Sequence, residues 1–448
     1  MLEIEYDPNG FSLREAIVEA KRCLNCAKPL CRTGCPIENE IPDFIHALAN
    51  GNLGQASAFI AHRSNLPAVC GRVCPREKQC EGACVLMRAG KGIKIGKIER
   101  FIADMEGELD IMPLPKKGKV KGKVAVIGSG PAGLTIAGDL AKADFTVTVF
   151  DAQEEPGGVL MYGIPAFRLP KQVVRREVYK IKKLGVTFKT NTMIGTDYTL
   201  DDLFKEGFDA IFIGTGNSMA KSLSLDGVRL PGVLQATYLL QMVALANQGS
   251  IDRYEIPVHE GENVIVIGAG NTAMDAARTA RRQGAASVLV VNRDTAENMA
   301  ALPSEVQVAK DEGVKFLSLR GPQRFVGTDC VTGLECCLRE VQGDKIVDTD
   351  HKEILPANKV IIAIGQKPAG RIVGSTKGIE VDEGGYVKTR ERPYGMTTRH
   401  GVFSGGDVAH GAATVVRAMK DAKQVAYGIA QYVEAKKLME DCGLNIEE

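Results

Sequence analysis

Two patterns of hydrophobic and polar residues divide this chain of 448 residues. After residue 122, short apolar runs alternate with helical stretches, and each run ends at a glycine or a polar turn. The runs are 123–128 (KVAVIG), 146–151 (TVTVFD), 263–268 (NVIVIG) and 287–293 (SVLVVNR), with a helix predicted at 272–283. Continuous apolar runs of this length are typical of buried parallel strands. The pattern therefore predicts two parallel-sheet units about 140 residues apart along the chain.

Before residue 110 the pattern is helical, and cysteine-rich loops interrupt it. We predict a helix at 11–24 with Ser12 as its N-cap, and shorter helices at 41–49 and 55–63. The stretch 112–123 (MPLPKKGKVKGK) is rich in Pro, Lys and Gly, which is typical of a linker.

Composition excludes several classes of protein. The net charge of +1 gives no basis for binding nucleic acid or an anionic membrane surface. The longest apolar stretches, such as 264–267 and 360–364, are too short to span a bilayer, and residues 1–10 lack the apolar run of a signal peptide. We therefore expect a cytoplasmic location, where clustered cysteines bind metals more often than they form disulfides.

A first glycine-rich loop, 128–133 (GSGPAG), lies between a predicted strand and a predicted helix. Its glycines, Gly128, Gly130 and Gly133, permit a tight turn and let backbone N–H groups approach a pyrophosphate at the helix N-terminus. Asp151 ends the next strand, where a carboxylate can accept hydrogen bonds from a ribose. A turn that binds no ligand is the alternative, but the strand, the helix and the acid are all present.

Two further glycine-containing segments accompany this loop. Residues 157–170 (GGVLMYGIPAFRLP) are suited to lie against a flat ring. Near the C-terminus, Gly406 and Asp407 precede 411–414 (GAAT) and a helix, whose N-terminus would stabilise the negative charge of a reduced flavin. Asp407 could hydrogen-bond a ribityl hydroxyl. Each segment alone could be an ordinary loop, but together they favour FAD.

A second glycine-rich loop, 268–273 (GAGNTA), again lies between a strand and a helix. The following strand ends at Asn292 and Arg293, without an acid. An acid there would favour NAD, whereas an Arg accommodates the 2′-phosphate of NADP. Arg293 therefore favours NADP, and a solvated surface arginine is the alternative.

Eight of the twelve cysteines lie between residues 23 and 84, as C23-x₂-C26-x₄-C31-x₃-C35-P and C70-x₃-C74-x₅-C80-x₃-C84. Ferredoxin-type sequences combine C-x₂-C with C-x₃-C-P, and their fourth cysteine binds a different cluster from the first three. Structural zinc also uses C-x₂-C pairs and is the alternative. The interleaved spacing favours iron–sulfur clusters. The other four cysteines, Cys330, Cys336, Cys337 and Cys442, and the six histidines show no such pattern.

The chain resembles a known family through motifs that extend over nearly its whole length: CLNCAKPLCRTGCP, CGRVCPREKQCEGACV, IGKIERF, GSGPAGL, PGGVLMYGIPAFRLPK, GAGNTAMD and GGDVAHGAATVV. This is the family of the small subunit of bacterial glutamate synthase. The chain is also similar to the large subunit of NADH-dependent ferredoxin:NADP oxidoreductase and to the N-terminal half of dihydropyrimidine dehydrogenase.

The resemblance implies an α/β fold in which an N-terminal α-helical iron–sulfur domain is followed by two Rossmann-like dinucleotide-binding domains, for FAD and NAD(P). We expect the helical domain at 1–111, a linker at 112–122, the FAD-binding domain in two parts at 123–218 and 366–448, and the NAD(P)-binding domain at 219–365.

The resemblance also implies which residues bind the cofactors. One 4Fe–4S cluster would be held by Cys23, Cys26, Cys31 and Cys84, and a second by Cys35, Cys74, Cys80 and Glu99. Cys70 matches a family cysteine that is not a ligand, and a helix-surface carboxylate is the alternative for Glu99. FAD would contact Gly128, Gly130, Ala132, Gly133, Asp151, Gly158, Arg168, Gly406, Asp407, Ala413 and Thr414. NADP would contact Gly268, Gly270, Asn271, Thr272, Arg293 and Gly365.

One departure from the family bears on the dinucleotide. Many relatives carry two consecutive arginines where this chain has Asn292 and Arg293, so a weaker preference for NADP, or use of NAD, stays open.

The resemblance implies an NAD(P)H-dependent oxidoreductase in which hydride transfer through FAD requires no catalytic side chain. Electrons would pass through the clusters to a partner in a hetero-oligomer. The partner would be the amidotransferase large subunit of glutamate synthase, in glutamate biosynthesis. The alternative is a small flavoprotein or ferredoxin-linked subunit of an electron-bifurcating ferredoxin:NADP oxidoreductase. A zinc-bearing scaffold without redox activity is a third hypothesis.

Overall fold

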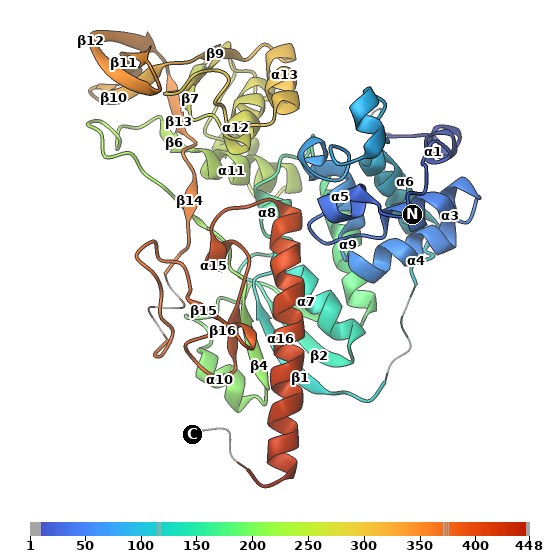
Figure 1. Ribbon diagram of the computed structural model, residues 1–448. Helices are drawn as coiled ribbons and strands as arrows, with labels where there is room; N and C mark the ends of the chain where they lie inside the picture. The colour runs from blue at the N-terminus through green and yellow to red at the C-terminus, as the bar shows by residue number, and fades with distance from the viewer. Residues whose placement is uncertain are drawn as a thin grey trace. The chain divides into compact units, whose positions relative to one another are not determined.

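The computed structural model describes residues 10–113, 115, 118–370, 372, 374 and 376–444. Residues 1–9, where we expect no signal peptide, and part of the predicted linker at 112–122 lie outside this set. The chain divides into two compact units. The first unit contains Met1–Met161, Phe167–Ser218 and Lys367–Glu448, and the second contains Tyr162–Ala166 and Met219–Gln366 (Figure 1).

The first unit begins with a helical domain. Its elements are α1 (Leu13–Ala20), α2 (Leu30–Gly34), α3 (Ile41–Ala49), α4 (Leu53–Arg63), α5 (Pro67–Val73), the 3₁₀ turns η1 (Arg76–Lys78) and η2 (Val85–Ala89), and α6 (Ile95–Leu109). Phe44, Ile45 and Ile98 lie in its apolar core, together with side chains from α1 and α4. The helices predicted at 41–49 and 55–63 are confirmed, the second beginning two residues earlier than expected.

The N-cap predicted at Ser12 is confirmed. The backbone N–H of Glu15 donates to Ser12 Oγ at 3.4 Å, and Glu15 Oε2 accepts from the backbone N–H of Ser12 at 2.8 Å, which completes a capping box. The helix ends at Ala20, so the predicted end at residue 24 was wrong. The chain instead enters a loop in which Asn25 has a φ of +46°, and this loop carries Cys23 and Cys26.

A seven-stranded sheet forms the rest of the first unit. Its strands are β1 (Gly122–Ile127), β2 (Phe145–Phe150), β3 (Thr187–Lys189), β4 (Ala210–Ile213), β15 (Thr389–Glu391), β16 (Tyr394–Thr397) and β17 (Val402–Ser404), in the order β15-β16-β17-β4-β1-β2-β3. The five strands from β17 to β3 are parallel, which confirms the expected sheet, and β15 and β16 are antiparallel.

Helices cover this sheet. They are α7 (Pro131–Lys142), α8 (Val159–Tyr162), α9 (Lys171–Lys183), α10 (Leu200–Lys205), α15 (Asp407–His410) and α16 (Val415–Asp441). The long helix α16 lies beside α7 (Figure 1). Among the described residues, no helix is both long and apolar enough to cross a bilayer.

The second unit contains a parallel sheet in the order β6-β13-β7-β8-β9. These strands are β6 (Val233–Gln235), β7 (Asn263–Ile267), β8 (Ser287–Val291), β9 (Lys315–Leu317) and β13 (Lys359–Ile362). The helical elements α11 (Ala236–Gln248), η3 (Arg253–Glu255), α12 (Asn271–Arg282) and α13 (Pro303–Asp311) accompany them. The strands predicted at 263–268 and 287–293 and the helix predicted at 272–283 are confirmed to within two residues.

An antiparallel sheet in this unit was not predicted. It consists of β10 (Arg320–Gly327), β11 (Val331–Gln342) and β12 (Lys345–Pro356), inserted between β9 and β13. Two short strands, β5 (Met219–Ala220) and β14 (Gln366–Lys367), pair with each other where the chain enters and leaves the unit.

Candidate functional sites

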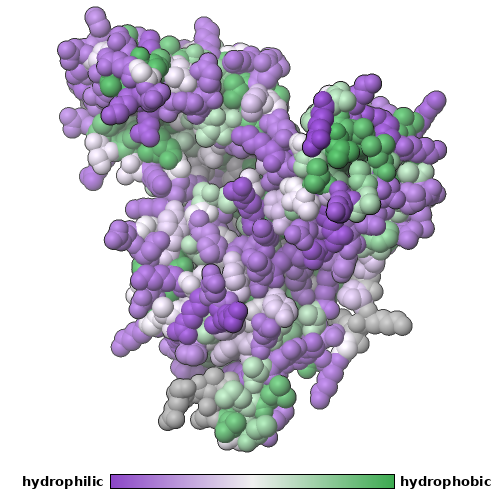
Figure 2. All heavy atoms as spheres, in the orientation of Figure 1, coloured by the Kyte–Doolittle hydropathy of each residue, from purple (hydrophilic) through white to green (hydrophobic). Residues whose placement is uncertain are grey.

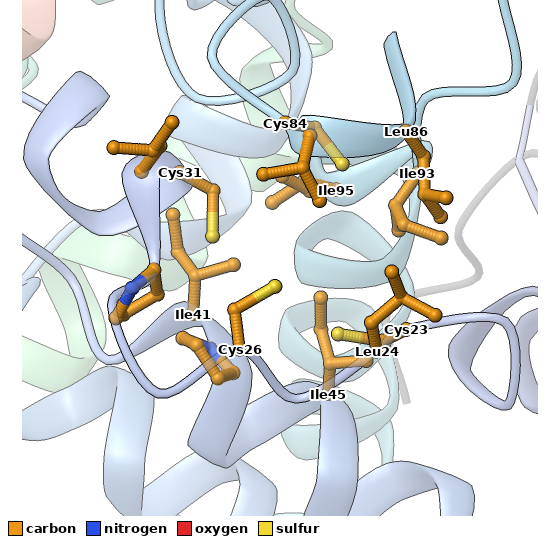
Figure 3. Close-up of a pocket in the computed structure, with 14 residues that line it drawn as sticks. Cys23, Leu24, Cys26, Cys31, Ile41, Ile45, Cys84, Leu86, Ile93 and Ile95 are labelled. Carbon is orange, nitrogen blue, oxygen red and sulfur yellow. The ribbon is translucent and has the colours of Figure 1, made fainter. Parts of the chain in front are cut away.

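Four cysteines from separate turns of the helical domain line one apolar cavity, the first cysteine site. Cys23 and Cys26 lie in the loop after α1, Cys31 lies in α2, and Cys84 is the N-cap residue of η2. Their sulfur atoms face a common space among isoleucine side chains (Figure 3). Burial, with smaller contributions from the neighbouring Cys23 and Cys84 thiols, raises the pKa of the Cys31 thiol to about 11. The sequence places these residues up to 61 positions apart, and the fold brings them together.

Three more cysteines and one carboxylate form the second cysteine site. Cys35 and Cys74 are the C-cap residues of α2 and α5, Cys80 follows η1, and Glu99 lies in α6. Burial raises the pKa of Cys35 to about 11, with smaller contributions from Glu99 and Cys74. Burial also raises the pKa of Cys80, and the charges of Glu99, Cys35 and Cys74 make smaller contributions in the same direction. These mutual effects show that the four side chains are neighbours.

Glu99 is held by two residues that the sequence did not point to. Asn39 Nδ2 donates to Glu99 Oε1 at 3.3 Å, across 60 residues of sequence. Burial raises the pKa of Glu99 to about 8, and the positive charge of Arg76 opposes that rise. A Cβ atom at Gly96 would lie 2.0 Å from the Arg76 side chain, so glycine leaves the room in which Arg76 lies against α6. The carboxylate is therefore fixed in place beside the cysteines rather than on a free helix surface.

The first cysteine site has room for a cluster. Its four thiols stand around a cavity (Figure 3), as four corners of a 4Fe–4S cluster require. Burial disfavours free thiolates here, and a cationic metal centre reverses that effect because it stabilises the deprotonated sulfur. The residues present therefore fit iron–sulfur clusters.

The first glycine-rich loop is closely packed everywhere except where a phosphate would lie. Gly128 has a φ of +93°, and a Cβ there would lie 2.6 Å from the carbonyl oxygen of Gly214. A Cβ at Gly133 would lie 1.9 Å from the carbonyl oxygen of Gly128. At Gly130, the N-cap of α7, a Cβ would meet no atom within 4 Å. Gly158 closes one side, since its Cβ would lie 2.8 Å from Gly130 Cα.

Asp151, one of two charged residues predicted for the FAD site, holds this loop. Asp151 Oδ2 accepts from the backbone N–H of Ser129 at 2.7 Å and from its hydroxyl, and Asp151 Oδ1 accepts from Gln153 N at 2.9 Å. Ser129 Oγ also accepts from the N–H of Gly157 at 2.9 Å, which ties the second glycine segment to the loop. Arg168 is partly buried between α8 and α9. Ser129 is a positioning residue that the motif did not reveal.

The C-terminal segment completes the predicted FAD site. Gly406 has a φ of +70°, and its Cβ would lie 3.0 Å from that of Ala132 in α7. Burial raises the pKa of Asp407 to about 6, while a hydrogen bond from Ala413 N at 3.3 Å opposes that rise. Thr414 is the N-cap of α16, and its buried hydroxyl makes no hydrogen bond. A buried hydroxyl without a partner at a helix N-terminus fits a polar ligand such as FAD.

The second glycine-rich loop repeats this construction in the second unit. Gly268 has a φ of +133°, and its Cβ would lie 2.4 Å from the carbonyl oxygen of Ala363. Gly270 is the N-cap of α12, and a Cβ there would again meet no atom within 4 Å. The backbone can therefore approach a pyrophosphate at this helix N-terminus.

The other residues predicted for the dinucleotide surround the loop. Asn271 Oδ1 accepts from Leu302 N at 3.1 Å, which fixes the segment before α13. Thr272 is exposed in the first turn of α12. Gly365 has a φ of +103°, and its carbonyl oxygen accepts from Lys221 N at 3.0 Å.

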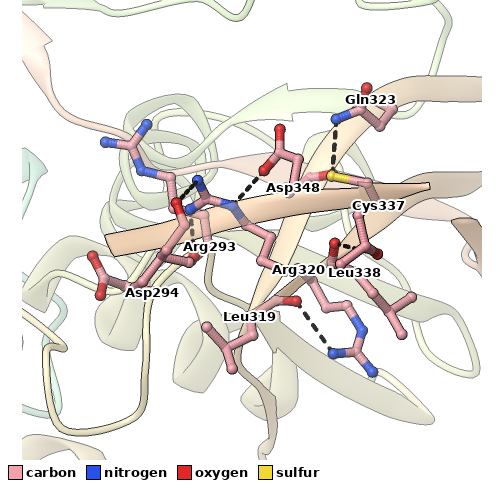
Figure 4. Close-up of polar contacts among 12 residues, drawn as sticks. Arg293, Asp294, Leu319, Arg320, Gln323, Cys337, Leu338 and Asp348 are labelled. Carbon is pink, nitrogen blue, oxygen red and sulfur yellow. Dashed lines mark hydrogen bonds and ion pairs between the residues drawn. The ribbon is translucent and has the colours of Figure 1, made fainter. Parts of the chain in front are cut away.

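Arg293 and Asn292 have different roles at the end of β8. Asn292 is 6% exposed, and its amide donates to the carbonyl oxygen of Asp294 at 3.1 Å, so it folds the turn and does not face a phosphate. The Arg293 side chain is exposed, and its carbonyl oxygen accepts from Arg339 Nη1 at 2.6 Å. Arg339 Nε also donates to Asp348 Oδ1 at 2.6 Å (Figure 4). Arg339, in the antiparallel sheet, therefore positions the turn that carries Arg293.

Comparisons with known proteins cover most of the chain. Two family models match the chain: dihydropyrimidine dehydrogenase domain II, 4Fe-4S cluster, at residues 3–111, and pyridine nucleotide-disulphide oxidoreductase at residues 122–422. A glutamate synthase (NADPH) small chain from Halomonas elongata is 37% identical over 96% of this chain and 93% of its own length. The NAD-dependent dihydropyrimidine dehydrogenase subunit PreT of Escherichia coli is 32% identical, covering 95% of this chain and 96% of PreT.

Solved structures agree with the fold. FprA of Mycobacterium tuberculosis, in complex with NADPH, has a TM-score of 0.58 at 18% sequence identity, over 73% of this chain and 87% of FprA. The expected fold class and family resemblance are confirmed. The chain is an oxidoreductase, and iron–sulfur, FAD and pyridine-nucleotide cofactors are confirmed for it through its family. The individual ligands and domain boundaries stay predictions.

Proposed function

Because this chain belongs to the glutamate synthase small-chain family, we propose that it delivers electrons from NADPH to a glutamate synthase large subunit in a cytoplasmic hetero-oligomer. The observation that carries this proposal is that one chain contains two cysteine sites and two open glycine loops. When bound, FAD accepts a hydride from the dinucleotide, and the clusters carry single electrons onward. No disulfide joins any of the twelve cysteines, so all seven cysteines proposed as cluster ligands keep their sulfur atoms for the clusters.

In this scheme the chain's own residues bind the cofactors and orient them. Gly130 and Gly270 leave space for the two pyrophosphates at the N-termini of α7 and α12. The N-terminus of α16, with the hydroxyl of Thr414, provides partial positive charge for the flavin ring. Arg293 presents its guanidinium to a 2′-phosphate, which supports NADPH over NADH.

The surface around the first cysteine site supports a protein partner. Leu24, Leu30 and Met87 are exposed by 62%, 44% and 37%, and both leucines line the cavity of the four cysteines. Figure 2 shows a hydrophobic area on this domain. Besides α3, which carries Asp43, two segments line the cavity, 23–31 and 84–95. The stretches 20–32 and 84–97 around them contain no Asp or Glu but eight basic residues: Lys21, Arg22, Lys28, Arg32, Arg88, Lys91, Lys94 and Lys97.

An apolar centre with a charged rim is the usual anatomy of a protein interface. We therefore propose that the large subunit covers the first cysteine site with a surface that is apolar at its centre and acidic around it. A shallow apolar contact would bring the partner's acceptor close to the first cluster, since Leu24 and Leu30 themselves line that site.

Anaerobic reduction of the purified chain tests the redox assignment. We expect NADPH to bleach the flavin and to produce a cluster EPR signal, with about eight iron atoms per chain for two four-iron clusters. Zinc in place of iron, with no bleaching by either nucleotide, would leave only the scaffold hypothesis.

The partner is tested separately by co-purification and by glutamate formation with the large subunit. A Leu24→Glu variant should keep NADPH-dependent bleaching but lose most partner-dependent turnover, because it places a negative charge at the centre of the contact. Leu438→Glu, on an equally exposed leucine at the far end of α16, is the matched control. Co-purification with a small flavoprotein instead of an amidotransferase would contradict the proposed large-subunit partner. It would favour the electron-bifurcating ferredoxin:NADP oxidoreductase.

A further inference from the structure

Cys70 lies next to the second cysteine site, although it is not one of the predicted cluster ligands. It belongs to α5, is 3% exposed, and precedes Cys74 by four residues, so the two side chains share one face of the helix. The backbone N–H of Cys74 donates to the carbonyl oxygen of Cys70 at 3.2 Å, which extends the last turn of the helix to Cys74. The Cys70 thiol donates to Sδ of Met419 at 3.6 Å.

Met419 connects this thiol to the predicted flavin site. It is fully buried in α16, five residues after Thr414, whose unpartnered hydroxyl marks the N-terminus of that helix. Helices α5 and α16 pack against each other. Cys70 shares a face of α5 with Cys74 and contacts Met419 in α16, so it lies between the second cysteine site and the helix of Thr414 inside one compact unit.

The position of Cys70 is rigid. The next residue, Gly71, packs so closely on α6 that a Cβ would lie 2.7 Å from Arg100 N. Its carbonyl oxygen accepts from Arg76 Nη1 at 3.1 Å. The sulfur of Met419 is a weak hydrogen-bond acceptor, whereas a cluster-bound thiolate is charged and accepts more strongly. The Cys70 thiol therefore lies between the weak acceptor Met419 and Cys74, which would become a strong acceptor as a cluster-bound thiolate.

We propose that Cys70 is a positioning residue that donates a hydrogen bond to the Cys74 sulfur when the second cluster is bound, and that it thereby raises the reduction potential of that cluster. This inference rests on the proposed function, because it requires a cluster at the second cysteine site. Hydrogen bonds to the sulfurs are one of the terms that set cluster potentials. A donor at Cys74 stabilises the additional negative charge of the reduced cluster, and Met419 holds the Cys70 side chain in line.

The test is a mediator-based redox titration of the full-length chain, followed by EPR and iron analysis, without NADPH or a partner. Cys70→Ala should keep its full iron content but lower the reduced-to-oxidised ratio of the second cluster roughly tenfold at fixed ambient potential, equivalent to about 59 mV for a one-electron couple. Cys70→Ser retains a donor of similar size and should stay close to wild type. Met419→Leu should give a smaller decrease than Cys70→Ala, because the donor remains.

The first cluster is the internal control, and Cys336→Ala removes an equally buried thiol in the second unit. The potential of the first cluster in Cys70→Ala should not change, and neither should the potential of the second cluster in Cys336→Ala. An unchanged potential in Cys70→Ala would overturn the inference, and so would an equal decrease in Cys70→Ser, which would point to packing. Loss of iron in Cys70→Ala would make Cys70 a ligand and also overturn it. Wild-type protein without any cluster would overturn the proposed function itself, whereas failure to bind a large subunit would leave this titration unaffected.

Discussion

Nη2 of Arg72 lies 2.7 Å from Oδ2 of Asp104, and both side chains are largely buried. Arg176 of α9 donates to the other oxygen of Asp104, and Arg100 Nε lies 3.6 Å from Oδ2. Three arginines thus share one carboxylate, and one of them belongs to the sheet part of the first unit. Burial opposes ionisation of Asp104, but the hydrogen bonds and charges of Arg72 and Arg176 lower its pKa below the ordinary value. Asp104 therefore joins the helical cysteine domain to the FAD-binding part.

Replacement of Asp104 by Asn should destabilise the first unit strongly. It removes the negative charge that the buried guanidinium groups of Arg72 and Arg176 share, which costs about 3–5 kcal/mol of the free energy of unfolding. Urea denaturation followed by circular dichroism measures this loss. Asp110→Asn, at the exposed pair with Lys183, is the control and should cost less than about 1 kcal/mol. Equal losses in the two variants would show that the buried network does not join the two parts.

Replacing each of the two glycines whose Cβ positions are unobstructed by alanine should show which loop binds the flavin and which binds NADPH. Gly130 and Gly270 have φ values of −68° and −94°, which alanine adopts without strain, and a Cβ there meets no protein atom. Gly130→Ala should therefore fold but lose most of its bound flavin, whereas Gly270→Ala should keep its flavin and show at least a tenfold higher KM for NADPH. Flavin absorbance and steady-state kinetics distinguish them. Flavin loss in Gly270→Ala would contradict the assignment of the two loops.

Much of the fold was predictable because the relevant signals are local. The Ser12 cap, the apolar strands and both glycine-rich turns are encoded within a few consecutive residues, and the structure has each of them. The antiparallel sheet was missed because its strands mix charged and apolar residues without regular alternation. In β11, for example, Cys336 and Cys337 are both buried although they are consecutive.

The site residues that sequence reasoning missed contact partners that lie far from them in the sequence. Asn39 reaches Glu99 across 60 residues, and Ser129 reaches Asp151 across 22. Neither residue type is unusual at its place in the sequence. Only the packing of α6 and the parallel order of β1 and β2 bring these partners into hydrogen-bond distance. The cysteine spacing indicated clusters, but division of the cysteines between two sites came from the family resemblance.

Arg293 should determine the choice of dinucleotide. A charged hydrogen bond contributes about 1.5–3 kcal/mol, so Arg293→Ala should raise the KM for NADPH tenfold or more and leave the KM for NADH nearly unchanged. Arg253→Ala, an exposed arginine of the same unit, is the control. Equal effects on both nucleotides would show that Arg293 does not contact the 2′-phosphate.

The turn that carries Asp407 should weaken as pH rises. Asp421 Oδ2 accepts from the N–H of Gly406 at 2.6 Å, and its other oxygen contacts His410 Nε2 at 3.1 Å and the hydroxyl of Tyr394 at 2.8 Å. The hydrogen bond to Asp421 raises the pKa of His410, while burial opposes the rise.

A group whose folded-state pKa is raised stabilises the protein below its unfolded pKa and loses that contribution as pH rises through the folded value. Wild-type protein should therefore lose more thermal stability than His410→Gln between about pH 6 and about pH 9. His400→Gln, an exposed histidine of the same unit, should keep the wild-type pH dependence. Parallel melting curves for wild type and His410→Gln across this range would show that the charge of His410 does not support the turn, and that the contacts of Asp421 with Gly406 and Tyr394 hold it alone.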